Sequence, residues 1–224
     1  MASGSDAARG TAHIVLLDSN FTSLPGVVFE GRQVINNIER VACLYLTKTI
    51  FSVLLSIYFI VTGLSYPFFP IHLTLIGAVT IGIPSFFLAL EPNGKRVEPG
   101  FLKKIMLNAV PGGVAVALYI ILLSVFQKAL NVDAEQLRTI AVLITAAIGF
   151  QVLIRASRPL NLIRIALLLA MAALFIAALL ITPAAILLLP IPTLYSLIVF
   201  GIFAATTIPV IFLIRKLIEY SKFH

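Results

Sequence analysis

The sequence predicts an all-α polytopic membrane protein with six transmembrane helices, preceded by a short α/β segment. The 224 residues are 60% hydrophobic and only 11% charged, whereas a soluble domain has about 25% charged residues. Six apolar stretches have about the 20 residues that a helix needs to cross roughly 30 Å of hydrocarbon. They are apolar on all faces, unlike the alternating strands of a membrane barrel. The stretches are 44–64, 71–90, 105–126, 137–154, 162–181 and 193–214.

The composition also excludes two other classes of protein. The hydrophobic content is far above that of disordered chains, which combine low hydrophobicity with high net charge. A disulfide scaffold is excluded because Cys43 is the only cysteine of the chain. Cys43 also has no cysteine or histidine at metal-ligand spacing, which argues against a thiolate site for copper or zinc.

The first forty residues are soluble in character. They show neither the apolar h-region nor the small-residue cleavage site of a secretory signal, so we expect no export of this end. Within residues 1–25, the apolar run Ile14–Leu17 between polar flanks predicts a buried strand. A lone strand would expose both of its hydrogen-bonding edges, so we expect this segment to be the end of a domain whose remainder lies upstream of Met1. Residues 26–43 predict a polar helix that leads into the first span.

Turn and breaker residues separate the spans. Pro67 and Pro70 follow the first span, Glu91–Gly94 the second, Asn131–Asp133 the third, Ser157–Pro159 the fourth and Thr182–Pro183 the fifth. Inside the third span, Pro111-Gly112-Gly113 predicts a kink and a close helix contact.

The basic residues predict the orientation. With the N-terminus in the cytoplasm, ten cations lie on the cytoplasmic side and two on the other side. Because cytoplasmic loops carry the excess of Lys and Arg, both termini are expected in the cytoplasm. The net charge of +7 then needs no nucleic-acid partner. The cytoplasmic set is Lys95, Arg96, Lys103, Lys104, Arg155, Arg158, Arg164, Arg215, Lys216 and Lys222, and the outer pair is Lys128 and Arg138.

Two spaced motifs carry a resemblance to a known family. Met1–Arg9 reads MASGSDAAR, and Ala12–Phe21 reads AHIVLLDSNF. Together they resemble the segment of P-type ATPases that follows the hinge motif of the phosphorylation domain, approximately MGSGSDAAKxxADIVLLDDNF. Glu30–Ile38 is similar to the EGRxxxxNI stalk of that family. The resemblance implies that residues 1–25 are a remnant of the HAD-like phosphorylation domain, that 26–43 form the stalk helix, and that 44–224 form transmembrane helices five to ten.

The resemblance also implies what lies elsewhere. Neither the phosphorylated DKTG motif nor the GDGxND hinge occurs in the 224 residues, so this chain is not expected to hydrolyse ATP by itself. We expect the C-terminal part of a bacterial plasma-membrane pump, produced by truncation or a split gene. Its partners would be the upstream ATPase domains, in the same or a separate polypeptide, the lipid bilayer and a transported cation. ATP and Mg²⁺ would serve the intact pump, with no cofactor in this chain.

The second span resembles the broken sixth helix of ion pumps, where the family pattern is N-x-x-T-D-G-x-P. Thr80, Gly82 and Pro84 keep that pattern, while Gly77 and Ile81 replace its Asn and Asp. Proline removes an amide donor, and glycine loosens the backbone, so carbonyl oxygens are expected to become free for an ion. Calcium sites usually include carboxylates, so a two-calcium site is disfavoured. The transported ion stays open, calcium included.

A polar stripe marks the first span at positions 45, 48, 49, 52 and 56. By resemblance, Thr49 and Ser52 fall where calcium pumps place Asn and Glu, so Thr49, Ser52, Gly77 and Thr80 form the candidate cation path. Lys48 is the sharpest feature, since a cation within a span costs at least about 2.5–3.5 kcal/mol on insertion scales. It is either a built-in counter-charge in a cation site or a side chain that snorkels to the interface.

Other polar residues have smaller expected roles. His72, at the outer end of the second span, is either solvated or a pH-sensitive gate. Asn108 and Gln151 are expected to hydrogen-bond across helices. In the loop after the second span, Glu91, Lys95 and Arg96 would either couple the phosphorylation domain to the broken helix or only set the topology.

The primary hypothesis is therefore the membrane-transport part of an ATP-driven P-type cation pump. The alternative is a free-standing six-span membrane protein or regulator, without enzymatic activity, that is derived from a pump. A passive channel is disfavoured because the spans supply no ring of charge.

Overall fold

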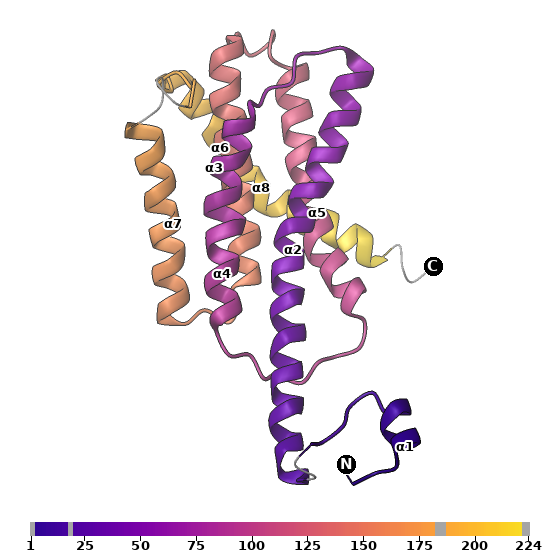
Figure 1. The fold of residues 1–224 in the computed structure, drawn as a ribbon. Coiled ribbons are helices and arrows are strands. Elements are labelled where there is room, and N and C mark those ends of the chain that lie inside the picture. The colour runs from indigo at the N-terminus through magenta and orange to yellow at the C-terminus, as the bar shows by residue number, and fades with distance from the viewer. Residues whose placement is uncertain (1–2, 18–19, 182–186, 221–224) are drawn as a thin grey trace.

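A computed structural model describes residues 3–17, 20–181 and 187–220 of the chain. In these ranges the chain is helical, contains no strand, and has six helices long and apolar enough to cross a membrane (Figure 1). The prediction of a six-span all-α membrane protein is confirmed. Met1, Ala2, Asp18 and Ser19 of the first motif, the separator Thr182–Pro183 and the cation Lys222 lie outside the described residues.

The elements follow the predicted spans closely. The fifth span matches the prediction at both ends, and the last helix continues six residues beyond the predicted 214. In order, the elements are α1 (Asp6–Thr11), the 3-10 turn η1 (Phe21–Ser23), α2 (Leu24–Thr62), α3 (Pro70–Gly77), the π-helical turn η2 (Ala78–Gly82), α4 (Ile83–Leu90), α5 (Phe101–Val125), α6 (Ala134–Ala156), α7 (Leu162–Ile181) and α8 (Leu194–Tyr220).

The predicted strand at Ile14–Leu17 is wrong. These residues follow the short helix α1 as irregular chain, and the side chains of Ile14 and Leu17 are 65% and 85% exposed. A strand is stable only when neighbouring strands satisfy its backbone groups and cover its apolar face. The described part of this segment has no such neighbour, so the local apolar pattern alone does not form a strand. Its assignment to a phosphorylation domain stays a prediction.

The stalk and the first span are one continuous helix. The 39 residues of α2 give a length of about 58 Å, and its N-terminal part extends beyond the rest of the bundle (Figure 1). The helix ends at Gly63, whose φ of 66° is left-handed and whose amide bonds the carbonyl of Phe59 at 3.0 Å. This is the usual glycine stop of a helix. Nothing interrupts α2 at the predicted boundary between residues 43 and 44.

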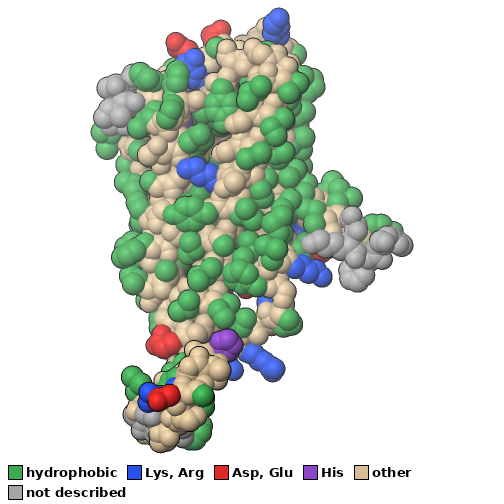
Figure 2. Space-filling view, turned by 45° about the vertical axis from the view of Figure 1, so that its right-hand side comes forward, with side chains coloured by type: hydrophobic (Ala, Val, Ile, Leu, Met, Phe, Trp, Pro, Cys, Tyr) green, Lys and Arg blue, Asp and Glu red, His purple; other side chains and the backbone are tan. Residues whose placement is uncertain are grey.

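The core lies where α2 and α6 pack against α5. Gly112 and Gly113 of α5 allow this contact: a Cβ at Gly113 would lie 2.7 Å from Cβ of Ile50 and 3.0 Å from the carbonyl of Thr47, and one at Gly112 would lie 2.6 Å from Cγ2 of Val152. The predicted close helix contact is confirmed. The helix α5 continues through Pro111. On the face shown in Figure 2, hydrophobic side chains cover most of the bundle, and most charged side chains lie toward its ends, while a basic side chain lies midway along it.

Replacing Gly113 by alanine should destabilise the bundle. The new methyl group meets a β-branched side chain and a backbone oxygen, neither of which can rotate away, so the free energy of unfolding should fall by about 1–3 kcal/mol. Gly201→Ala in α8 is the control, because a Cβ there meets nothing within 4 Å. Thermal unfolding in detergent measures both. Equal midpoints for the two variants would contradict the contact.

Candidate functional site

The second span changes its helical geometry at the predicted place. Between α3 and α4, the π-helical turn η2 replaces one α-helical turn, and the amide of Ile83 bonds the carbonyl of Ala78. Pro84 follows at the start of α4 and cannot donate to the carbonyl of Thr80 four residues earlier. The helix is thus wound differently rather than unwound. Such π-helical turns are frequent at functional sites.

A small cavity lies between this turn and the helices α2, α5 and α6. Its volume is about 20 Å³, enough for about one water, which needs roughly 10–15 Å³ by this measure. Three of the predicted site residues line it, Lys48, Gly77 and Thr80, together with two threonines that the sequence reasoning missed, Thr47 and Thr145. The other lining residues are apolar side chains or glycine.

Lys48 extends to the turn at Gly77. Its Nζ lies 3.1 Å from the point where a Cβ of Gly77 would be, so the ammonium fits there because residue 77 has no side chain. Lys48 is fourteen residues from the C-terminal end of α2, or about 21 Å along the helix. Within the described ranges, no hydrogen bond or ion pair of this ammonium occurs. The side chain is half-buried.

The threonine hydroxyls of the cavity donate to carbonyls of their own helices. Thr80 Oγ1 donates to Ile76 at 2.7 Å, and Thr145 Oγ1 donates to Ala141 at 2.8 Å. Because each hydroxyl has one proton and two acceptor lone pairs, both oxygens keep acceptor capacity. They can therefore accept from an ammonium or coordinate a cation. Gly149 of α6 lets Thr80 approach, since a Cβ at Gly149 would lie 3.0 Å from Thr80 Cγ2.

Thr49 and Ser52 lie away from this cavity. Thr49 is exposed and donates to the carbonyl of Tyr45 at 3.2 Å, while Ser52 is half-buried and does not line the cavity. The polar residues predicted to share one face of α2 therefore do not all reach the cavity: Lys48 lines it, and Thr49 and Ser52 do not. The side chain of Thr47 instead lies between α2 and α5. Its hydroxyl lies 2.9 Å from the carbonyl oxygen of Cys43 in α2 and 3.3 Å from that of Ala109 in α5, and it donates to this pair of acceptors.

Carboxylates do not gather anywhere in the described part of the chain. There, no three His, Cys, Asp or Glu side chains come together as metal ligands would. Cys43 is a buried free thiol. In the cavity beside Lys48, the only side-chain oxygens among the lining residues are the hydroxyls of Thr47, Thr80 and Thr145.

His72 is buried, so the expectation of a solvated histidine is wrong. Its Nδ1 accepts from the amide of Phe69 at 3.1 Å, which leaves the proton on Nε2 to be donated to the carbonyl of Leu187 at 2.7 Å. His72 thus joins the start of α3 to the segment before α8. Gln151 forms the expected bond across helices, from its Nε2 to Thr207 Oγ1 at 2.6 Å.

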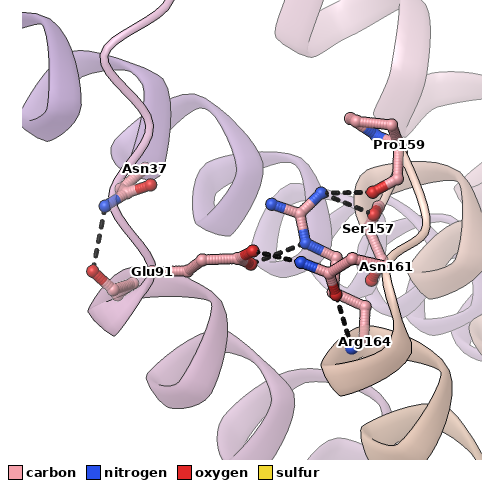
Figure 3. A network of polar contacts seen from close by, with 7 residues as sticks. Asn37, Glu91, Ser157, Pro159, Asn161 and Arg164 are labelled. Atoms are coloured by element: carbon pink, nitrogen blue, oxygen red, sulfur yellow. Dashed lines mark hydrogen bonds and ion pairs between the residues drawn. The ribbon is translucent and has the colours of Figure 1, made fainter.

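A second polar cluster joins α4 to α7 (Figure 3). Glu91, directly after α4, accepts from Arg164 Nε and from Asn161 Nδ2, both at 2.6 Å. Arg164 also donates to the carbonyls of Ser157 at 2.9 Å and Pro159 at 2.6 Å. The side chain of Arg164 is 7% exposed and that of Glu91 is 24% exposed. The buried guanidinium therefore has both a counter-charge and backbone acceptors.

Two asparagines of the stalk form hydrogen bonds with the end of α4 and with the loop that follows it. Asn37 Nδ2 donates to the carbonyl of Ala89 at 2.9 Å, and Asn36 Nδ2 donates to those of Asn93 and Lys95, also at 2.9 Å. Of the three predicted coupling residues, Glu91 contacts α7 through its side chain, and Lys95 contacts the stalk through its backbone. The side chain of Arg96 is exposed.

The pKa of Glu91 is lowered. Partial burial alone would raise it, but the hydrogen bonds from Arg164 and Asn161 and the charges of Arg164 and Arg40 outweigh burial. A carboxyl whose pKa is lower in the folded state stabilises the fold above its unfolded pKa of about 4.3 and loses that contribution as the pH falls through the folded pKa.

Glu91→Gln should lower the free energy of unfolding by about 1–3 kcal/mol at neutral pH, the usual value of a hydrogen bond to a charged group. It should also flatten the acid limb of the stability curve below about pH 4.3. Unfolding midpoints between pH 7 and pH 3 test both expectations. Glu98→Gln is the control, because the ion pair of Glu98 with Lys104 is solvent-exposed and such pairs add little. Parallel curves for the wild-type chain and Glu91→Gln would refute this role.

No protein-family model matches the chain. It is, however, similar to the calcium-transporting ATPase CtpE of Mycolicibacterium smegmatis, with 44% identity over 173 residues, which are 71% of this chain and 22% of that protein. CtpE of Mycobacterium bovis is 44% identical over 184 residues, 76% of this chain and 23% of that protein. The "Probable cation-transporting ATPase exp7" of Streptococcus pneumoniae is 37% identical over 175 residues, 75% of this chain and 22% of that protein. The matched part thus spans less than a quarter of the length of these relatives.

Proposed function

The chain is homologous to part of the bacterial cation-transporting P-type ATPases, and from this premise we propose that it forms the ion-translocating membrane part of such a pump. The six apolar helices make it a multi-pass membrane protein. ATP hydrolysis with Mg²⁺ would take place in the upstream domains of the whole pump. We place the pump in the bacterial plasma membrane, with both termini of this chain in the cytoplasm, because the cations gather on that side.

One observation carries the proposal: the Lys48 ammonium lies against a helix whose geometry changes within the membrane. An ionisable residue inside a span normally serves transport, because its cost is otherwise unopposed. Here the ammonium lies beside Gly77, and the hydroxyl-bearing Thr80 and Thr145 line the same cavity as Lys48. Lys48 then acts as a built-in cation that occupies this site in one state of the transport cycle.

The coupling follows from the continuity of α2. Movement of the upstream domains would tilt the stalk part of α2, and the same helix carries Lys48. Asn36 and Asn37 bind the stalk to the loop after α4, while Glu91 binds that loop to α7. Stalk motion would therefore shift Lys48 and would also displace the α4 end of the second span. Because the π-helical turn η2 lies between that end and Gly77, the displacement would reach Gly77 less than Lys48, and alternating access would arise from the movement of Lys48 relative to Gly77.

The proposed cation path combines the cavity with the outward face of α2. Thr80, Gly77 and Thr145 supply oxygens from inside the bundle, while Thr49 and Ser52 would supply theirs on the face that upstream helices cover in the whole pump. Calcium, which appears in the names of two relatives, is one candidate ion. A cation held by hydroxyl and carbonyl oxygens has fewer charged ligands than calcium sites usually have.

Lys48→Met in the full-length pump should change the number of cations moved per ATP, because the variant removes a positive charge from the transport site. Proteoliposomes assayed for uptake of Ca²⁺, Mn²⁺, Mg²⁺, Na⁺ and K⁺ beside ATP hydrolysis give this ratio. Ser124→Ala is the control, because that hydroxyl bonds only the carbonyl of Ile120 within its own helix. An unchanged ratio and rate in Lys48→Met would reject the transport role of Lys48.

Thr80→Val and Thr145→Val should each weaken the apparent affinity for the transported cation about tenfold, equivalent to about 1.4 kcal/mol for one lost ligand oxygen. The cation concentration that half-activates ATP hydrolysis measures this effect. Thr49→Val, assayed in parallel, measures whether a hydroxyl on the outward face of α2 contributes to cation affinity. Loss of affinity in Thr49→Val alone would move the ion site out of the cavity and contradict the proposed path.

A further inference from the structure

A second cavity lies between α2, α5 and α6, at the end of the bundle where most cations gather. Its volume is about 190 Å³, many times the roughly 10–15 Å³ that one water needs by this measure. It is lined by Glu39, Arg40, Cys43, Asn108, Val152, Arg155, Ala156 and Arg158. None of these residues lines the Lys48 cavity except Val152, which separates the two.

The walls of this cavity are strongly basic. Arg40, Arg155 and Arg158 contribute three positive charges against the single negative charge of Glu39, a net charge of +2. Arg215 lies close enough to Arg155 to add to the positive potential there. In the described part of the chain, no hydrogen bond or ion pair joins these three guanidinium groups to another side chain. The three guanidinium groups thus outnumber the one carboxylate of the cavity, and among the described residues none of them forms a salt bridge with it.

Arg40 supplies an independent sign that an acceptor belongs here. Its Nη1 is fully buried and has no hydrogen-bond partner among the described residues. A guanidinium has five donors in a fixed planar fork and no acceptor, and an unpaired buried charged donor is costly. Arginine forks match the oxygens of phosphate groups in particular.

We propose that this cavity binds the phosphate of an anionic phospholipid headgroup. Basic pockets between transmembrane helices at the cytoplasmic side are suited to such headgroups. The inner wall is apolar at Val152 and Cys43. Each of the three helices also carries an exposed apolar residue within two sequence positions of a lining residue, namely Ile38, Met106 and Ile154. An acyl chain can lie along these residues while the phosphate reaches the arginines, an arrangement that a free phosphate ion does not need.

The test uses the 224-residue chain in detergent, titrated with phosphatidylglycerol or with phosphatidylcholine of identical acyl chains. Native mass spectrometry measures bound lipid, and thermal unfolding measures stabilisation. Phosphatidylglycerol should bind at least tenfold more tightly than phosphatidylcholine, and Arg155→Gln/Arg158→Gln should abolish this preference. Lys103→Gln/Lys216→Gln is the matched control: it removes the same charge from exposed positions outside the cavity and should keep the preference.

Equal binding of the two lipids, or an equal loss of preference in the two double variants, would overturn the proposal. Inorganic phosphate is added in a separate arm, and displacement of phosphatidylglycerol by millimolar phosphate would make this a site for free anions rather than lipid.

A second measurement needs no variant. Cys43 is the only cysteine of the chain and lines the cavity, so phosphatidylglycerol should slow its alkylation by N-ethylmaleimide severalfold more than phosphatidylcholine does. Equal rates would refute the site.

Discussion

Hydrocarbon offers no hydrogen-bond partner, and this constraint governs where every polar group of the bundle lies. Most hydroxyls inside the spans, such as those of Thr47, Thr80 and Thr145, donate to a carbonyl one helical turn earlier. His72 and Gln151 bond across helices. Against this background the exceptions are informative. The ammonium of Lys48 and Nη1 of Arg40 lack partners within the described residues, and each of them borders a cavity. Among the described residues, Asn37 Oδ1 and Ser157 Oγ are also buried without a hydrogen-bond partner, but neither atom carries a charge. The two unpaired cations are therefore the groups for which we propose a ligand, an ion or a moving helix as the missing partner.

The second consequence of the same constraint is mechanical. Because backbone groups in the membrane must stay paired, a span moves as a rigid helix unless its winding changes locally. The helix α2 is uninterrupted from the stalk to Gly63, so it can transmit a tilt along its whole length. The second span has a π-helical turn at Ala78–Gly82, beside Lys48. A rigid helix that carries a charge thus lies against a helix with an alternative winding. Asn37 joins α2 to α4, and Asn36 joins it to the loop that follows α4.

The spans were predictable because hydropathy is a local property, and the fifth was placed at the correct residues. The strand at Ile14–Leu17 was not, because a strand depends on partners that a local pattern cannot supply. The polar stripe of the first span identified Lys48, and the resemblance to the broken helix of ion pumps identified Gly77 and Thr80; all three line one cavity. The sequence reasoning missed Thr47 and Thr145, because the spacing of polar residues along one helix does not show which neighbouring helix each face contacts. The pair of Glu91 with Arg164 joins residues 73 positions apart, for which a single sequence holds no signal beyond the two charges.

The charge of Lys48 limits how a cation can use the cavity. Two unit charges 4 Å apart repel by about 4 kcal/mol at an effective dielectric constant of 20. An ion between Thr80 and Thr145 would share the cavity with this ammonium, because Lys48 lines it as well. Of the nine acidic residues of the chain, none falls well inside a span, so no carboxylate of these helices offsets that repulsion. Under the proposed function, the presence of Lys48 in the cavity therefore opposes the binding of an ion there. Movement of α2 that carries Lys48 away from Gly77 would remove this repulsion, so stalk movement would precede ion binding rather than result from it.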